Sequence, residues 1–353
     1  MSETRPSGIP KKGITVGTER AFVDELVTRT SPELPERFFD RFVFNLHRTD
    51  AVTPSVLFGF GSYPPRDVVD GFAILVTETE QRNVRFSTEL TATDGDGAGP
   101  FRFEVVEPMR TWHLTLGPNP TGMEFDVTWR ARTPAWVGDI GVTNDGGTPS
   151  TFEHLVQSGL YDGTLTIDGV TEEVHDWYGQ RDRSRGVRNM SGGQGLHIWH
   201  QAQFPDRSVG FLYVEDREHQ PILLEGAVMH TDGELDGIVG VRHELRFNDS
   251  LDLQSGRVEV TTAGGVTYQI NADASAGGGY MSGGWYGGQH GRPMGRDYEE
   301  HDVYPLDGTV SPKTVDSALT DRLTKFTWGD VVGYGIFEFA HSRSSRYRYR
   351  PSL

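Results

Sequence analysis

The 353-residue sequence contains no cysteine, and this absence excludes several kinds of site at once. Disulfide bonds, iron–sulfur clusters, zinc sites with thiolate ligands and cysteine nucleophiles all require a thiol. Long apolar runs are missing as well, because no segment approaches the roughly 18 apolar residues of a membrane-spanning helix. Residues 1–17 are polar and lack the apolar core of a signal peptide. We therefore predict a cytoplasmic protein with no stable insertion into a membrane.

Basic residues are few relative to acidic ones. The chain has 33 lysines and arginines against 50 aspartates and glutamates, and its formal net charge is −17. A strongly acidic protein is repelled by nucleic acid and by anionic membrane surfaces. We predict that neither is a partner of this protein, while a homodimer is compatible with the sequence.

The motifs of metal, phosphate and serine chemistry are absent too. The histidines form no compact ligand triplet and are scattered at His154, His175, His197, His200, His290 and His301. The glycine-rich run 277–291 lacks the lysine–hydroxyl pair of a phosphate-binding loop, and Gly-x-Ser-x-Gly does not occur. We predict no metal site and no cofactor. Trp285 and Tyr286, within the glycine-rich run, are instead predicted to contribute to the rim of a pocket.

Helical periodicity is scarce, and strand patterns dominate. Thr18–Thr28 could form one short amphipathic helix, and Ser31-Pro32-Glu33 predicts a second helix start. Apolar and polar residues alternate in the runs 101–105, 112–116 and 123–131. Such runs predict strands with one buried face.

The length and the turns of the chain suggest how these strands are organised. Turn residues recur between the strand-like runs, for example at 144–147, and 353 residues suffice for two domains with their own cores. We predict an all-β fold of two tandem antiparallel β-barrel domains with little helix. The predicted parts are a flexible N-terminus (1–17), a first barrel (18–175) and a second barrel (176–353).

The most unusual stretch is His175–Arg188, at the middle of the chain. It contains four arginines within eight residues, with Asp182 among them and with Trp177 and Tyr178 before them. Arginine does not give up its charge, so such a cluster requires carboxylates or carbonyls around it. Two interpretations remain open. One is a buried ion-pair network that holds two domains together, and the other is a network that positions the Asp182 carboxyl at the mouth of a cavity.

A predicted hairpin follows this stretch, with Pro205-Asp206 at its turn. Side chains alternate along a strand, so each arm places polar and aromatic groups on one of its faces. If these faces lie on the same side, they line a small-molecule pocket inside a barrel. The alternative is that this side faces solvent and the opposite side forms the core. The residues of the predicted pocket face are His197, Trp199, Phe211, Tyr213 and Glu215.

The order of these motifs resembles one known group of proteins. Tyr178–Arg188, His197-x-Trp199 and Tyr213-x-Glu215, together with the segments 107–112, 157–163 and 333–338, resemble the AttH-like/carotenoid 1,2-hydratase superfamily, especially its bacterial branch. This superfamily includes hydroxyneurosporene synthases and kievitone hydratase. The resemblance extends from about residue 38 to residue 351. It implies two lipocalin-like β-barrels in tandem and the cofactor-independent addition of water to a C=C bond of an isoprenoid.

The resemblance also implies roles for individual residues. A His-x-Trp pair and a Tyr-x-Asp pair are tied to activity in this superfamily, and they correspond to His197, Trp199, Tyr213 and, in place of the aspartate, Glu215. Because glutamate is one methylene longer, Asp182 stays an alternative acid. We predict that Glu215 or Asp182 protonates the substrate, that His197 holds or deprotonates the water, and that Trp199 and Tyr213 stabilise the cation.

Two other functions stay open at this point. Lipocalin-like barrels also bind hydrophobic molecules without converting them, and a pericyclase or isomerase could use the same pocket. In each case the predicted partner is a hydrophobic small molecule of terpenoid type. The side chains predicted to bind it are Trp177, Tyr178, Phe211, Trp285 and Tyr286.

Overall fold

The computed structural model describes residues 24, 26, 30–143, 149–188 and 194–353. The predicted flexible terminus (1–17), most of the predicted helix at 18–28 and the predicted turn at 144–147 lie outside these residues. The prediction of little helix is confirmed. The helical segments of the described residues are three short 3-10 turns, η2 (Pro64–Arg66), η3 (Leu90–Ala92) and η4 (Met281–Gly284). The predicted helix after Ser31 is wrong, because only a few residues separate it from a strand rich in phenylalanine.

The first half of the chain forms a curled half-barrel in which every strand pairing is antiparallel. The strand order is β19-β4-β3-β2-β1-β11-β10-β8-β7-β6-β5, and β9 pairs with β10. The strands are β1 (Phe38–His47), β2 (Ser55–Tyr63), β3 (Val68–Val76), β4 (Glu80–Glu89), β5 (Gly97–Ala98), β6 (Phe101–Glu107), β7 (Thr111–Leu116), β8 (Met123–Ala131), β9 (Trp136–Thr143), β10 (Pro149–Ile167), β11 (Val170–Val187) and β19 (Tyr298–Pro305).

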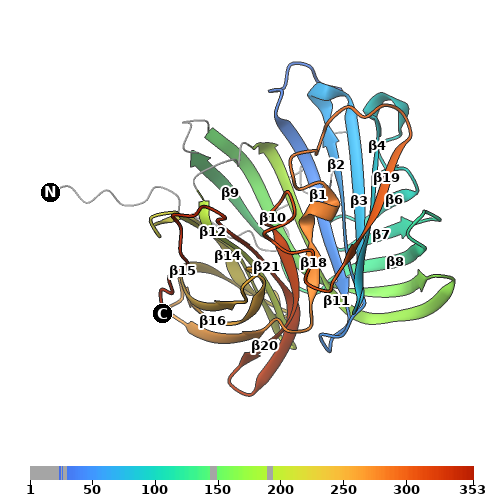
Figure 1. Cartoon of the computed structure of the whole chain (residues 1–353). Coiled ribbons are helices and arrows are strands. Elements are labelled where there is room, and N and C mark those ends of the chain that lie inside the picture. Colours follow the sequence, from blue (N-terminus) through green and yellow to red (C-terminus); the bar gives the residue numbers. More distant parts are fainter. Residues whose placement is uncertain (1–23, 25, 27–29, 144–148, 189–193) are drawn as a thin grey trace.

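The second half forms a closed eight-stranded barrel, which lies beside the first sheet (Figure 1). Its order is β17-β16-β15-β14-β13-β12-β21-β20, the pairing of β17 with β20 closes it, and β18 adds to β20. The strands are β12 (Gln194–Phe204), β13 (Arg207–Asp216), β14 (Pro221–His230), β15 (Leu235–Phe247), β16 (Leu253–Thr262), β17 (Thr267–Asp273), β18 (Gly278–Tyr280), β20 (Thr320–Trp328) and β21 (Val331–His341). The predicted all-β fold of two tandem lipocalin-like barrels is confirmed, with one barrel closed and the other a half-barrel.

The first sheet extends beyond the predicted first half of the chain at two places. Strand β11 runs without interruption from Val170 to Val187, so the predicted division between residues 175 and 176 falls inside it. Strand β19 comes from the second half of the sequence and pairs with β4 at the edge of the first sheet (Figure 1). The first sheet is therefore completed by a segment that follows most of the second barrel in the sequence.

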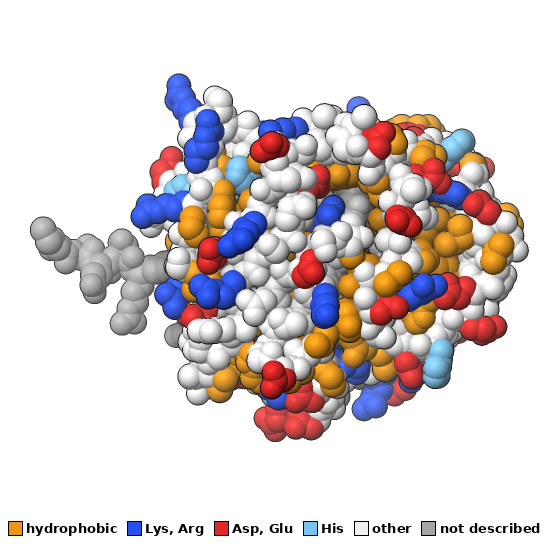
Figure 2. Space-filling view, turned by 60° about the horizontal axis from the view of Figure 1, so that its bottom comes forward, with side chains coloured by type: hydrophobic (Ala, Val, Ile, Leu, Met, Phe, Trp, Pro, Cys, Tyr) orange, Lys and Arg blue, Asp and Glu red, His pale blue; other side chains and the backbone are white. Residues whose placement is uncertain are grey.

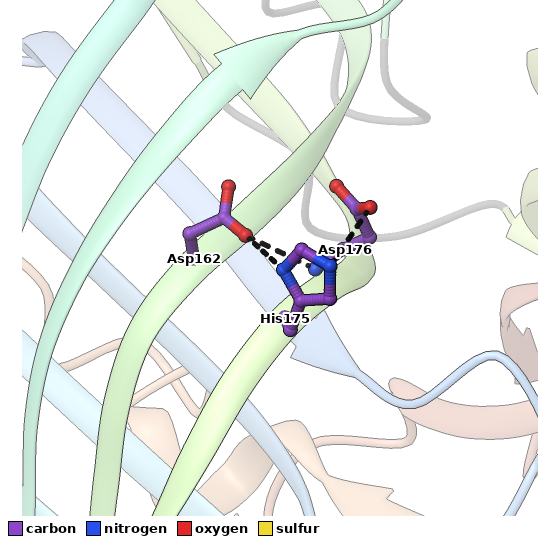
Figure 3. A group of neighbouring side chains, drawn as sticks. All are labelled: Asp162, His175 and Asp176. Carbon is purple, nitrogen blue, oxygen red and sulfur yellow. Dashed lines mark hydrogen bonds and ion pairs between the residues drawn. The ribbon is translucent and has the colours of Figure 1, made fainter.

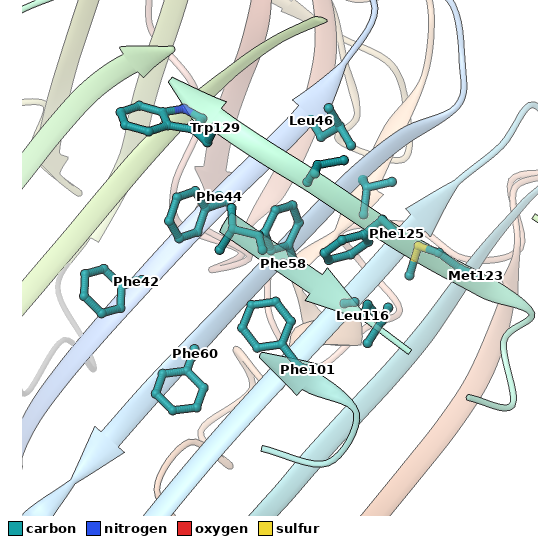
Figure 4. Packing of buried hydrophobic residues seen from close by; sticks show 14 of the residues in the cluster. Phe42, Phe44, Leu46, Phe58, Phe60, Phe101, Leu116, Met123, Phe125 and Trp129 are labelled. Carbon is teal, nitrogen blue, oxygen red and sulfur yellow. The ribbon is translucent and has the colours of Figure 1, made fainter. Parts of the chain in front are cut away.

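The interior of the half-barrel is a packed aromatic core (Figure 4). Phe44 stacks on Phe58 at a centroid distance of 5.4 Å, and Phe42 meets Trp112 edge-on at 4.8 Å. The core also contains the buried faces of strands β6, β7 and β8, whose sequences predict their alternating burial. Aromatic pairs at such distances add about 0.5–1.5 kcal/mol each beyond the area they bury.

Two arginines of the central stretch enter this aromatic core. The Arg183 guanidinium donates to Asp40 at 2.9 and 2.8 Å, and its centre lies 4.5 Å from the centroid of the Phe42 ring. Arg181 lies over the rings of Trp112 and Trp129, at 5.1 and 5.4 Å. Inside the half-barrel, Asp40 therefore neutralises the charge of Arg183, and the guanidinium of Arg181 stacks on two tryptophan rings. The interpretation of the central stretch as a buried ion-pair network thus applies to these two side chains. The network lies within one sheet.

The outer faces of the two sheets pack against each other. One apolar cluster joins them, with Phe39 and Phe152 from the first sheet and Leu212 and Ile336 from the second. Arg132 adds polar contacts by donating to backbone carbonyls beside the β12–β13 turn, among them Phe204 O at 2.6 Å. On the face shown in Figure 2, acidic and basic side chains are interspersed. No helix within the described residues has the length and apolar character needed to cross a bilayer.

Candidate functional site

A cavity of about 730 Å³ lies between the two sheets. Its wall combines β1 and β11 of the half-barrel, β12, β13, β20 and β21 of the closed barrel, and the loop after η4. Small-molecule sites typically have volumes of about 300–1,000 Å³, so the cavity is large enough for a substrate of drug-like size. The prediction of a pocket inside one barrel is therefore wrong for the His197 face, which lines the junction of the two sheets.

Strand alternation explains which side chains reach this cavity. On β11, Arg181 and Arg183 point into the half-barrel, whereas Asp182 and Ser184 line the cavity. On β12, His197 and Trp199 line the cavity. The other interpretation of the central stretch, a carboxyl placed at a cavity, agrees with the position of Asp182.

The predicted convergence of the hairpin side chains is wrong. Trp199 is directly opposite Leu212, and Tyr213 is opposite Ile198, which lies in the core of the closed barrel. Directly opposite residues project to the same side of a sheet, so Tyr213 and its neighbour Glu215 point into the barrel, away from the cavity. A two-residue turn between Phe204 and Arg207 causes this, because it pairs odd-numbered residues with even-numbered ones.

Tyr213 and Glu215 belong to a separate buried network. The Tyr213 hydroxyl donates to Glu215 Oε1 at 2.9 Å, and His243 Nε2 lies 3.0 Å from the same oxygen. His243 Nδ1 in turn lies 2.9 Å from the hydroxyl of Tyr349. Burial, and then the charge of Glu215, raises the pKa of the Tyr213 phenol. This network connects β13 and β15 to the C-terminal segment.

This position leads to an expectation for Glu215→Gln. The substitution should lower the free energy of unfolding by about 1–3 kcal/mol, because it weakens a buried hydrogen-bonded network. Activity and ligand affinity per folded molecule should remain within about twofold of the parent protein, because Glu215 does not line the cavity. Chemical unfolding and activity assays on the same samples measure both. A loss of activity that exceeds the loss of folded protein would contradict the assignment.

Two acids that the sequence analysis did not single out face each other in the cavity wall. Asp321 on β20 and Glu338 on β21 are directly paired across the strands and share a hydrogen bond. Burial raises the pKa of Asp321 well above its usual range, and the charges of Glu338 and Asp182 add to this effect. Burial and these charges therefore favour the protonated form of Asp321. His197 Nε2 lies 2.9 Å from Glu338 Oε1.

A second chain of hydrogen bonds reaches the cavity from the half-barrel. His154 on β10 lies between two carboxylates, with Nε2 at 2.6 Å from Asp182 Oδ2 and with Nδ1 against Glu225 Oε1. Trp136 Nε1 donates to the other oxygen of Glu225 at 2.6 Å. Burial alone would lower the pKa of His154, but Asp182 and Glu225 outweigh it and raise the pKa to about 10. An imidazolium thus links Asp182, at the cavity, to Glu225 of the other sheet.

The five side chains predicted to bind substrate are spread over the molecule. Tyr286 lines the cavity, with the Arg41 guanidinium 5.0 Å from its ring centroid. Phe211 stacks on His200 inside the closed barrel at 4.8 Å. The other three lie elsewhere: Trp177 beside Arg48, Tyr178 beside Arg132, and Trp285 beside Tyr298. The cavity thus contains one of the five residues.

One group of side chains has the composition of a metal site, although we predict no metal. Asp162, His175 and Asp176 lie together on β10 and β11 (Figure 3), with His175 Nδ1 at 3.0 Å from Asp162 Oδ1. The Arg130 guanidinium contacts both aspartates, at 3.3 Å from Asp176 Oδ1. A fixed positive charge already contacts both carboxylates, and the group lies at the surface, so we assign it no ligand.

The fold of the protein is similar to that of known structures. Its fold is similar to that of a putative AttH from Nitrosomonas europaea, with a TM-score of 0.59 at 12% identity over 94% of this chain and 98% of that one. Kievitone hydratase from Nectria haematococca matches with a TM-score of 0.47 at 12% identity, over 96% and 99% of the two chains. The resemblance to the AttH-like superfamily is confirmed for the fold.

The chain belongs to the "Family of unknown function (DUF8625)", whose profile matches residues 27–346. No match was found among proteins with curated annotation.

Proposed function

We propose that the protein is a cofactor-independent hydratase, or dehydratase in the reverse direction, for a C=C bond of a hydrophobic, isoprenoid-type molecule. One observation carries this proposal. Asp321, a buried acid whose pKa is raised by burial and by the charge of Glu338, shares a cavity with Asp182, which is hydrogen-bonded to His154. An acid whose surroundings favour its protonated form, together with a second carboxyl group held by a histidine, can act as the proton donor and the proton acceptor of general acid–base catalysis.

The proposed reaction uses these two groups in turn. Asp321 transfers its proton to one carbon of the double bond, and the other carbon becomes a tertiary carbocation. A water molecule adds its oxygen to this carbon, and the Asp182 carboxylate accepts the proton that the water loses. Proton exchange through solvent then returns both carboxyl groups to their starting states, so the net change is the addition of one water.

Other cavity residues support these steps. Glu338 accepts the hydrogen bond of Asp321, and His197 contacts Glu338, so His197 acts as a positioning residue. The faces of Trp199 and Tyr286 can stabilise the carbocation, each by about 0.5–2 kcal/mol. This revises the expected roles, since Asp321 takes the place of Glu215 as the acid and Tyr286 takes that of Tyr213.

A binding protein and an isomerase are the competing functions. A buried acid pair costs stability, and simple capture of an apolar ligand does not need it. An isomerase would use the same acid and base but would return the proton to solvent without adding oxygen. Catalysis is therefore favoured over binding, and the fate of water distinguishes hydration from isomerisation.

The test is incubation with a panel of isoprenoids in ¹⁸O-labelled water, followed by mass spectrometry. We expect a product that is heavier by one labelled water and that does not form with the Asp182→Asn variant. An isomer of unchanged mass would replace the hydratase by an isomerase. Tight binding with no conversion over the whole panel would contradict the proposal and favour a carrier.

A further inference from the structure

Two arginines in the cavity wall have buried side-chain nitrogens that lack a hydrogen-bond partner within the described part of the chain. Among the described residues, neither Nε nor Nη2 of Arg41 has a hydrogen-bond partner, although both are buried and the residue is only 8% exposed. The Nε of Arg188 is likewise buried and unpartnered. By contrast, Arg183 in the half-barrel forms an ion pair with Asp40. Each buried donor nitrogen that lacks a hydrogen bond costs free energy, so these three nitrogens call for an acceptor.

The strands bring these two guanidiniums to one place. Arg41 on β1 is directly opposite Ser184 on β11, and Arg188 Nη2 donates to the Ser184 hydroxyl at 3.1 Å. Burial, and then the positive charge of Arg41, lowers the pKa of Arg188. Two like charges held in proximity repel each other, and an anion between them would remove that repulsion.

Aromatic rings fix the orientation of both groups. Arg41 lies over Tyr286 at 5.0 Å, and Arg188 lies over Phe152 and Phe39 at 4.3 and 4.9 Å. A stacked guanidinium keeps its donors at the edge of its plane, where they suit the paired oxygens of a carboxylate or a phosphate. The acids whose charges act on these arginines, Asp70, Asp182 and Glu338, also have other partners. Asp182 contacts His154, and Asp70 accepts from the Gly291 backbone at 2.7 Å.

We propose that Arg41 and Arg188 bind an oxyanion at one end of the substrate. The substrate class is then a hydrophobic molecule that carries a carboxylate or a phosphate, and this inference rests on the proposed function of the same cavity. The anion lies against Ser184, two residues along β11 from Asp182. It therefore sets the distance between the head of the substrate and the double bond that Asp321 protonates.

Binding of three matched probes tests this assignment without any need for turnover. Farnesol, farnesoic acid and farnesyl monophosphate share one apolar chain and differ in charge, and calorimetry on the Asp321→Asn protein measures their affinities. We expect farnesoic acid or the phosphate to bind about tenfold or more tightly than the alcohol, because a hydrogen bond to a charged group contributes at least this much. Comparison of the two anions identifies the head group. Equal affinities of all three would overturn the proposal.

Variants then assign the preference to the two arginines. The double variant Arg41→Met/Arg188→Met should reduce the preference for the anion to less than about twofold. Arg41→Lys should retain part of this preference, because lysine keeps the positive charge but lacks the paired donors of the guanidinium. Arg242→Met is the matched control, since Arg242 is exposed and pairs with Glu259 on the closed barrel. A preference that survives in the double variant would contradict the site. If the double variant does not fold, each single Met variant is measured instead. Loss of labelled-water incorporation with the anion preference intact would reject the hydratase alone.

Discussion

Asp321→Asn is expected to reduce turnover by about 10²–10⁴-fold while leaving the fold intact. The asparagine has nearly the same size as the aspartic acid but no acidic proton, and a positioned general acid typically contributes a factor of this size. Because burial and the charges of Glu338 and Asp182 favour the protonated form of Asp321, the neutral asparagine preserves the favoured charge at this position. Substrate affinity should therefore change little, and the reduced turnover should appear as a lower kcat.

Infrared spectroscopy and a matched variant make this expectation sharper. The protonated carboxyl of Asp321 should give a C=O stretching band at neutral pH that disappears in Asp321→Asn, whether or not a substrate is known. Asp252 is the control, because burial also raises the pKa of its carboxyl but it does not line the cavity. Asp252→Asn should keep its activity per folded molecule. An unchanged kcat in Asp321→Asn, or an equal loss in both variants, would exclude Asp321 as the acid.

His154→Gln is expected to lower the free energy of unfolding by about 3–5 kcal/mol at pH 7. The imidazolium of His154 is buried between the carboxylates of Asp182 and Glu225, and it joins β10 and β11 to β14 of the other sheet. Removal of one partner from a buried ion pair leaves an uncompensated charge, which is the costly case. Chemical unfolding of both proteins measures the difference.

The pH dependence of stability gives this variant a distinct signature. Folding raises the pKa of His154 from 6.5 to about 10, so the folded state retains a proton that the unfolded state loses. The corresponding stability, on the order of 4 kcal/mol, is complete below pH 6.5, declines as the pH rises toward 10 and is absent above it. The difference in the free energy of unfolding between the parent protein and His154→Gln should therefore decrease as the pH rises from 6.5 to about 10.

His175→Gln is the control for this measurement. It removes a histidine from the same sheet, but the His175 side chain is 83% exposed, so stability should change by less than about 0.5 kcal/mol. If the free energy of unfolding falls equally with rising pH in the parent and in His154→Gln, then His154 does not cause the pH dependence.

Part of the site could have been found in the sequence. The two-residue turn at Pro205-Asp206 already implies that Trp199 pairs with an even-numbered residue, and this rule places Tyr213 on the opposite face. Glu338 stands between Phe337 and Phe339 on an alternating strand, which marks it as an acid on the less apolar face. The resemblance drew attention to the hairpin instead, and the pairing of Asp321 with Glu338 was missed.

The sequence by itself determined the all-β class, the two halves and the strand alternation, because these follow from local periodicity and turn chemistry. It also identified Asp182, His197, Trp199 and Tyr286 as side chains of interest, and all four line the cavity. Only the tertiary structure decided where the cavity lies. Asp182, Asp321 and Glu225 are far apart in the chain, and they meet because two sheets pack face to face. The raised pKa of Asp321 depends on burial and on the charges of Glu338 and Asp182, which no local pattern encodes.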